Sequence, residues 1–183
     1  MKKYKKILIV THQYLPHVSP RTTRWKLLVD ELIDNGHNVS ILTGMYPDFD
    51  TSNVEIIYFG NKNNINIVSN LREKSKQVAS GDAIKKTFYG VLKKIYRFFI
   101  NYLAWPDYSM FWLYQIYKNR NKISKDYDVI ISVSLPFSSH MAAYFINKKV
   151  KKHWIMDIGD PFSLKVDAPE NNRFLYSGLN KRY

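Results

Sequence analysis

The sequence predicts an α/β protein with a Rossmann-like, doubly wound parallel sheet in the strand order 3-2-1-4-5. Short apolar runs rich in β-branched residues alternate with helical patterns along the chain. The first run is continuously apolar, as expected of a parallel strand that is buried on both faces. The length of 183 residues and the hydrophobic share of 45% fit one domain with a sizeable core. We therefore expect residues 1–183 to form a single Rossmann-like domain.

The first part of this fold is predicted from apolar runs and from helical spacing. We expect a strand, a helix and two more strands at residues 7–11, 21–35, 39–43 and 54–59. Gly36 is placed to end the helix, because glycine readily adopts the left-handed backbone found there. A polar loop that contains proline separates the first strand from the helix. The segment therefore reads as β-α-β followed by another strand.

An inserted segment over residues 60–125 interrupts the alternation. Residues 60–83 are rich in Asn, Ser and Lys without a period, which predicts an exposed connection. Residues 84–103 place apolar side chains on one helical face and basic side chains around the other, which predicts a basic amphipathic helix. A second, aromatic-rich helix is predicted from residue 108 or 109 to about 123.

The alternation then resumes and completes the sheet. We expect a strand, a helix and a last strand at residues 128–134, 138–149 and 153–157. The pattern weakens after Pro161.

The charge of the chain is concentrated in the inserted segment. Lys and Arg number 28 and Asp and Glu 15, a net charge of +13, and residues 61–125 alone hold thirteen bases against three acids. One hypothesis is that the amphipathic helix lies on an anionic membrane surface through Lys86, Lys93, Lys94 and Arg97. The other is that its apolar face packs on the sheet and its bases are solvated. Both can hold in part.

Composition excludes several classes of function. Without cysteine the chain has no disulfide, thiolate metal site or cysteine nucleophile. No signal peptide and no run of about 18 apolar residues is visible, so we expect a cytoplasmic protein, peripheral at most at the inner face of a membrane. No nucleic-acid-binding signature is present, so we expect no specific nucleic acid partner despite the basic charge. The His and Asp pairs of the loops lack ligand spacing, so no metal is expected.

Three loops are expected to meet where the strand order reverses, the usual ligand position in such sheets. The candidates from the three loops are His12, Tyr14, Ser19, Arg21 and Arg24; Pro136, Ser138, Ser139 and His140; and Asp157 and Asp160.

The chemistry of these candidates leaves alternatives open. Arg21 and Arg24 sit in the first turn of a helix, where an anion is favoured, but they also fit solvated surface charges. The first loop has no glycine fingerprint for a dinucleotide or phosphate. His140 could donate to a sugar hydroxyl or phosphate, and Ser138 could simply cap its helix. Asp157 could accept hydrogen bonds from ligand hydroxyls, act as a base, or tie its loop to backbone amides.

Two blocks of sequence resemble the N-terminal domain of family 4 glycosyltransferases. The first is YLPHVSPRTTRWKLLVDELIDNGHNVSILTG, which follows the pattern Y-x-P, loop, Arg, helix and G-H-x-V. The second is WPDYSMFWLYQIYKN…YDVIISVSLPFSSHMAAYFINKK…HWIMDIGDPF, which is similar to S-x-P-P-x-S-x-H followed by W-x-x-D-x-R-D-P-W. The chain departs from the family pattern at the first-loop glycines and at Leu135, Gly159 and Phe162.

The resemblance implies the acceptor-binding half of a retaining, two-domain GT-B glycosyltransferase. Arg24, Pro136, Ser138, His140, Asp157 and Asp160 match family positions, and we expect His140 and Asp157 to be the catalytic residues. The co-substrate would be a nucleotide-sugar, used without a metal, and the acceptor would be a lipid-linked saccharide in surface polysaccharide synthesis. The donor-binding C-terminal domain is missing from these residues, so we expect this chain alone to be inactive.

Two other functions compete with this interpretation. The chain could be a non-catalytic acceptor-binding or membrane-anchoring subunit that docks with a separate donor-binding chain. It could also be a basic nucleic-acid-binding protein, which the composition favours least. The exposed cleft of an isolated half could also support a homodimer.

Overall fold

The computed structural model describes residues 4–45, 53–60, 90–92, 94–95, 98, 106–124 and 126–159. Its elements are, in chain order, β1 (Lys6–Val10), α1 (Pro20–Asp34), β2 (Asn38–Thr43), β3 (Glu55–Tyr58), α4 (Met110–Asn119), β4 (Val129–Val133), α5 (Ser138–Val150) and β5 (His153–Asp157). Each matches an element predicted from the sequence. The largest difference is at α4, which ends at Asn119 instead of near residue 123.

The five strands form one parallel sheet in the order β3-β2-β1-β4-β5, which confirms the predicted fold class. The central strand β1 pairs with β2 on one side and with β4 on the other. In this register Ile9 lies opposite both Ile41 and Ile131. The strand order therefore reverses between β1 and β4.

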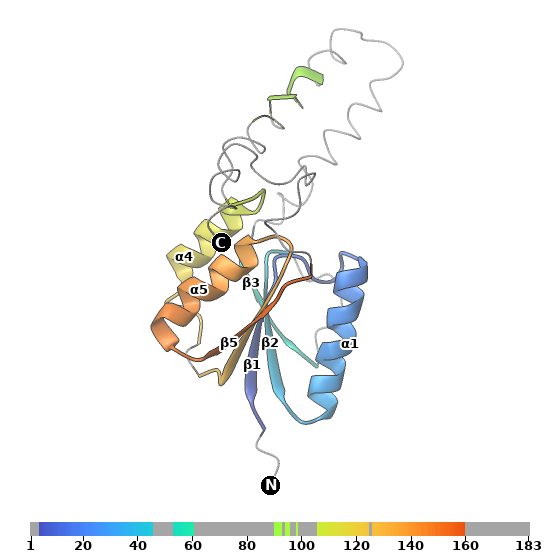
Figure 1. Cartoon of the computed structure of the whole chain (residues 1–183), viewed down its shortest axis with the longest axis vertical. Helices are drawn as coiled ribbons and strands as arrows, with labels where there is room; N and C mark the ends of the chain where they lie inside the picture. Colours follow the sequence, from blue (N-terminus) through green and yellow to red (C-terminus); the bar gives the residue numbers. More distant parts are fainter. Residues whose placement is uncertain are drawn as a thin grey trace.

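Helices cover both faces of the sheet, with α1 on one side and α4 and α5 on the other (Figure 1). Because side chains of a strand alternate between faces, β1 contributes to both cores. Leu8 and Val10 pack with α4 and α5, and Ile7 and Ile9 pack with α1. The burial of β1 on both faces explains its continuously apolar sequence.

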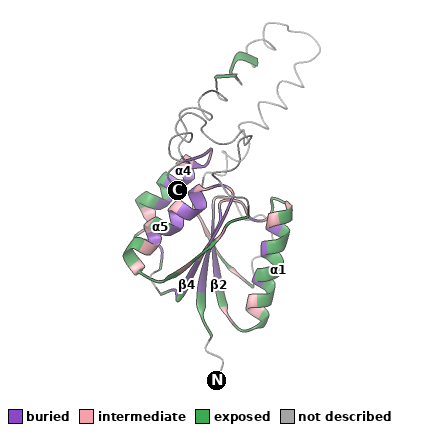
Figure 2. Cartoon of the chain, viewed as in Figure 1, coloured by how far each residue is buried: buried purple, intermediate pink, exposed green. Residues whose placement is uncertain are grey.

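The helices bury one stripe each and leave the rest exposed, as Figure 2 shows. Helix α1 packs Trp25 and Val29 on the sheet. It ends as the sequence predicts, since Asn35 caps it and Gly36 follows with φ 84°. The amide of Gly36 donates to the carbonyl of Ile33 at 2.7 Å, and this turn leads directly into β2.

The predicted amphipathic helix is described only at residues 90–92, 94–95 and 98, which are helical. Its apolar residues Val91, Leu92, Ile95 and Phe98 are 39–59% exposed. Lys94 is also exposed, whereas Lys86, Lys93 and Arg97 lie outside the described residues. Among the helices that the structure describes, none has the length and apolarity that a membrane crossing requires.

Candidate functional site

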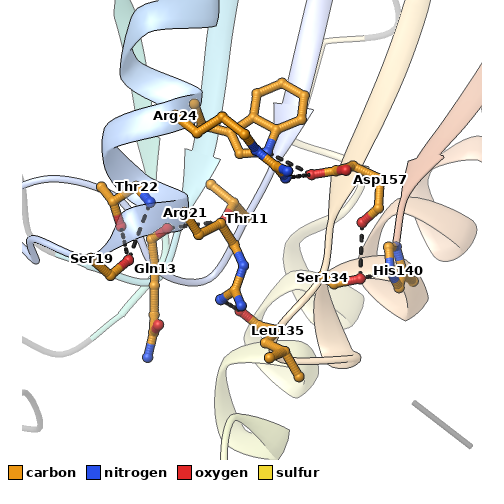
Figure 3. A network of polar contacts seen from close by, with 11 residues as sticks. Thr11, Gln13, Ser19, Arg21, Thr22, Arg24, Ser134, Leu135, His140 and Asp157 are labelled. Atoms are coloured by element: carbon orange, nitrogen blue, oxygen red, sulfur yellow. Dashed lines mark hydrogen bonds and ion pairs between the residues drawn. The ribbon is translucent and has the colours of Figure 1, made fainter. Parts of the chain in front are cut away.

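Three loops meet at the carboxyl ends of β1, β4 and β5, as the sequence predicts. Helix α1 follows β1 and helix α5 follows β4, and these two helices cover opposite faces of the sheet. The chain therefore diverges at this edge of the sheet, between the ends of β1 and β4, and we call this place the divergence. Such a divergence is where doubly wound sheets bind their ligands. Figure 3 shows the polar side chains that line it.

The Asp157 carboxylate joins the end of β5 to the beginning of α1. One of its oxygens, Oδ2, accepts from Arg24 Nη2 at 2.5 Å and from Trp25 Nε1 at 2.7 Å. The side chain of Asp157 is 25% exposed and that of Arg24 is 51% exposed. The pair is therefore held in place and is still reachable from solvent.

A second arginine of α1 crosses to the other side of the divergence. Arg21 Nη1 donates to the backbone carbonyl of Leu135 at 3.2 Å, in the loop after β4. Ser19 caps α1, because its hydroxyl accepts from the amide of Thr22 at 3.1 Å. The structure therefore uses Ser19 for helix capping, and it places the Arg21 and Arg24 guanidinium groups over the loops that follow β4 and β5.

His140 lies inside the protein and is 3% exposed. Its Nδ1 is 2.7 Å from the Ser132 hydroxyl and its Nε2 is 3.0 Å from the Ser134 hydroxyl. The structure therefore does not place its ring nitrogens where a substrate could reach them, although the sequence predicted a catalytic, ligand-facing role. The ring is buried because α5 begins at Ser138, so its first turn packs directly against the end of β4.

The hydrogen bonds around His140 define its tautomer. Ser134 Oγ donates its one proton to the backbone carbonyl of Asp157 at 2.9 Å, so it must accept from His140 Nε2–H. On the other side Trp154 Nε1 donates to Ser132 Oγ at 2.8 Å, which leaves the Ser132 proton for His140 Nδ1. A directed chain thus runs from the Trp154 indole to the backbone of Asp157.

Burial lowers the pKa of His140 to about 4, and the charge of Asp157 opposes this shift. The neutral imidazole that the hydrogen bonds require is therefore the dominant form at neutral pH. In this state His140 orients the strand end that carries Asp157.

The beginning of α5 is occupied by a carboxylate of the protein itself. Asp107 is 1% exposed and accepts from the Ser138 amide at 2.8 Å and from the Ser138 hydroxyl at 2.7 Å. It also accepts from the amide and hydroxyl of Ser109 at 2.9 and 2.6 Å. Ser138 is therefore a helix-start residue that binds Asp107, and the anion-favouring end of α5 is filled from within.

The remaining candidates of the first two loops are also tied to the fold. Ser139 Oγ accepts from the amide of His12 at 3.1 Å. The His12 ring meets the rings of Tyr108 and Trp112 edge-on, with centroids 5.6 and 5.1 Å away. Burial lowers the pKa of His12 to about 4, with a smaller contribution from His17.

Two candidates lie in or beside the hydrophobic layer. Tyr14 is 2% exposed and packs with the α1 core, and burial raises its pKa to about 12. Pro136 is buried after a cis peptide bond with Leu135. Asp160 lies outside the described residues.

Sequence reasoning missed four residues that build this site: Trp25, Asp107, Ser132 and Ser134. Trp25 follows the apolar spacing of α1, and nothing in that spacing indicates its hydrogen bond to Asp157. Asp107 directly follows Pro106, between the two predicted helices of the inserted segment, and an acid just after a proline was the available signal. Ser132 lies in β4 and Ser134 directly follows the strand, and this spacing of two residues brings both side chains to one face of an extended chain.

The groups that face solvent here are the Asp157 carboxylate and the two guanidinium groups of α1. Together they can accept and donate hydrogen bonds within one small region, as sugar hydroxyls or phosphates require. No cluster of three His, Cys, Asp or Glu side chains suited to a metal ion occurs in the part of the chain that the structure describes.

Comparisons with known proteins leave the family open. Neither the models of known protein families nor the curated proteins contain a match to this chain. The resemblance to family 4 glycosyltransferases therefore rests on the quoted motifs alone.

Proposed function

We propose that this chain is the acceptor-binding half of a retaining glycosyltransferase. In this proposal a second Rossmann-like domain binds the nucleotide-sugar, and the loops after β1, β4 and β5 hold the saccharide acceptor. The acceptor is lipid-linked, and the product belongs to a surface polysaccharide. The support comes from the motifs of both sequence blocks and from the polar groups gathered at the divergence of β1 and β4.

The observation that carries the proposal is the Arg24–Asp157 pair. Both described contacts of the carboxylate use Oδ2. Oδ1 is then the oxygen that accepts a hydrogen bond from a hydroxyl of the saccharide. The half-exposed guanidinium of Arg24 donates a hydrogen bond to a neighbouring oxygen of the same sugar. A hydrogen-bond acceptor beside a hydrogen-bond donor fits the vicinal hydroxyls of a pyranose. If Asp157 takes a proton from the attacking hydroxyl, it serves as the base of the reaction.

His140 has a positioning role in this proposal. Through Ser134 it holds the backbone carbonyl of Asp157, so it fixes the strand end from which the carboxylate projects. A substitution at His140 would alter acceptor binding through Asp157 and not through a lost contact with the sugar.

The exposed apolar residues of the inserted segment favour a second candidate, a non-catalytic subunit that anchors the acceptor at a membrane. Val91, Leu92, Ile95 and Phe98 are exposed beside Lys94, as an interfacial helix requires. The two candidates share the acceptor site and differ in whether Asp157 takes part in chemistry.

Saccharide binding by the purified chain tests the shared part of the proposal. Saturation-transfer NMR against a panel of hexoses, N-acetylhexosamines and their disaccharides is expected to show binding to at least one of them. Asp157→Asn and Arg24→Gln are expected to abolish that signal, and Lys26→Gln, an exposed change two residues after Arg24, is expected to preserve it.

Two outcomes would count against an acceptor site. One is a chain that binds no member of the panel. The other is an Asp157→Asn variant that binds as well as the unchanged protein.

A further inference from the structure

The outer side of α4 carries a row of exposed aromatic rings. Phe111, Tyr114 and Tyr117 are 61%, 61% and 46% exposed, although aromatic side chains of this size are usually covered. They recur every three residues, so they follow one side of the helix. The opposite side packs Trp112 and Ile116 into the core.

This row continues onto α5, which lies beside α4 (Figure 1). The Tyr117 ring is 5.1 Å from Phe145, and the Phe145 ring is 5.6 Å from Tyr144. Tyr144 is itself 47% exposed. We call these rings the aromatic band: Phe111, Tyr114, Tyr117, Tyr144 and Phe145.

Basic residues gather where both helices end. Residues 110–124 hold Lys118, Arg120 and Lys122, residues 138–152 hold Lys148, Lys149, Lys151 and Lys152, and neither segment holds an acid. The two groups are neighbours in space, because Lys149 Nζ donates to the side chain of Asn121. The aromatic band therefore has a positive border, in which the one described acid acting on a lysine is Asp126 beside Lys152.

We propose that the α4–α5 face binds the surface of an anionic lipid bilayer. Exposed Tyr and Phe rings suit the headgroup boundary, where apolar ring atoms leave water and the tyrosine hydroxyl stays solvated. Lysine stems extend along such a surface and bring their charges to the lipid phosphates.

The composition of the positive border favours lipid over nucleic acid. All but one of its bases are lysine, a flexible point charge, whereas bidentate phosphate recognition favours arginine. The single arginine, Arg120, is turned toward its own helix. Its guanidinium carbon lies 4.0 Å above the Tyr117 ring, and it donates to the Tyr117 carbonyl.

The binding needs no sugar and no catalysis, so it can be tested separately from the acceptor site. It also uses a surface other than the amphipathic segment around residue 94.

Vesicle sedimentation of the full chain tests the positive border. The protein is mixed with phosphatidylcholine vesicles, with and without phosphatidylglycerol. We expect binding to the anionic vesicles only, and a loss of about 100-fold for the triple variant Lys118→Gln, Lys148→Gln and Lys152→Gln, at roughly fivefold per lysine. The matched control removes three lysines outside the described residues, Lys62→Gln, Lys74→Gln and Lys76→Gln, and changes the net charge equally.

A second pair of variants tests the aromatic band. Phe111→Gln with Tyr114→Gln is expected to weaken binding about tenfold. Leu27→Gln with Leu28→Gln replaces two exposed apolar residues of α1, on the other face of the sheet, and is expected to leave binding unchanged. All four positions are exposed, so we expect each variant to fold. Circular dichroism and urea unfolding verify this.

Three results would overturn the proposal. The first result is that the control variant binds vesicles as weakly as the triple variant does, which would make the loss of binding an effect of net charge. Both variants of the α4–α5 face could bind vesicles normally. The third result is that duplex DNA displaces the protein from anionic vesicles and that the triple variant no longer binds this DNA. This result would make the α4–α5 face a nucleic acid surface.

Discussion

At the scale of single residues, buried polar groups determine how the loops are arranged. Asp107 is the clearest case, since one carboxylate accepts from two amides and two hydroxyls at the beginning of α5. An isolated buried charge is strongly unfavourable, and the four donors compensate for that cost. The sequence could not predict the two bonds from Ser138, because Asp107 and Ser138 are 31 positions apart and only the tertiary fold brings them together.

Replacing Asp107 is therefore expected to be costly. Asp107→Ala leaves four buried donors without their acceptor and should lower the free energy of unfolding by about 3 kcal/mol or more. Asp107→Asn keeps one acceptor oxygen and should cost about half as much. Urea unfolding followed by circular dichroism measures both, with the exposed change Asp30→Asn as the control, for which we expect less than about 0.5 kcal/mol. An Ala variant as stable as that control would refute the role assigned to Asp107.

The buried histidines predict a pH dependence of stability. The pKa of His140 is lowered from 6.5 to about 4 in the folded protein, so the unfolded chain binds its proton more readily. Stability is therefore complete above about pH 6.5 and is lost as the pH falls toward 4, by up to roughly 3 kcal/mol for this group. His12 shifts in the same direction and for the same reason.

The slope itself can be tested by substitution. Between pH 6.5 and 4, His140→Gln should flatten the dependence of the unfolding free energy on pH, whatever it does to stability at pH 7. His153→Gln, at an exposed position at the beginning of β5, is measured in parallel as the control for replacing a histidine. Equal slopes in the His140 variant and the unchanged protein would mean that His140 does not titrate differently on unfolding.

At the scale of elements, local chemistry explains why the sequence predicted so much of the fold. Strands buried on both faces show as apolar runs, and Gly36 supplies the left-handed residue that α1 needs at its end. The site was predicted less well. The loops and their meeting point follow from strand order, but whether a side chain faces solvent or the interior depends on partners in other elements, as for His140 and Ser139.

The cap of α1 allows a direct test at this scale. Ser19→Ala removes the acceptor for the Thr22 amide and should lower the free energy of unfolding by about 1 kcal/mol. Ser19→Asp should restore most of the loss, because a carboxylate also accepts from that amide and favours a helix beginning. A thermal unfolding series with the exposed change Thr23→Ala as control distinguishes capping from a general effect on the helix. If Ser19→Asp is no more stable than Ser19→Ala, capping is not what Ser19 contributes.

At the scale of the whole molecule, one Rossmann-like sheet accounts for the described core. Under the proposed function, sugar transfer also needs a donor-binding domain, whereas the described residues of this polypeptide build the sheet assigned to the acceptor. We therefore expect the purified 183-residue polypeptide by itself to transfer no sugar from any nucleotide-sugar. Incubation with radiolabelled donors and chromatography of the products measures this. Turnover by the chain alone would contradict the two-domain proposal.

The buried anchor at Asp107 also makes the fold modular. The chain leaves the sheet after β3 near Gly60 and is pinned again at Pro106 and Asp107, both buried, before α4 begins. Two of the hydrogen bonds that Asp107 accepts come from Ser138 of α5, so they tie the beginning of α4 to the sheet side of the fold. We therefore expect that a segment of other length and chemistry can replace residues 61–105 while the parallel sheet keeps its register.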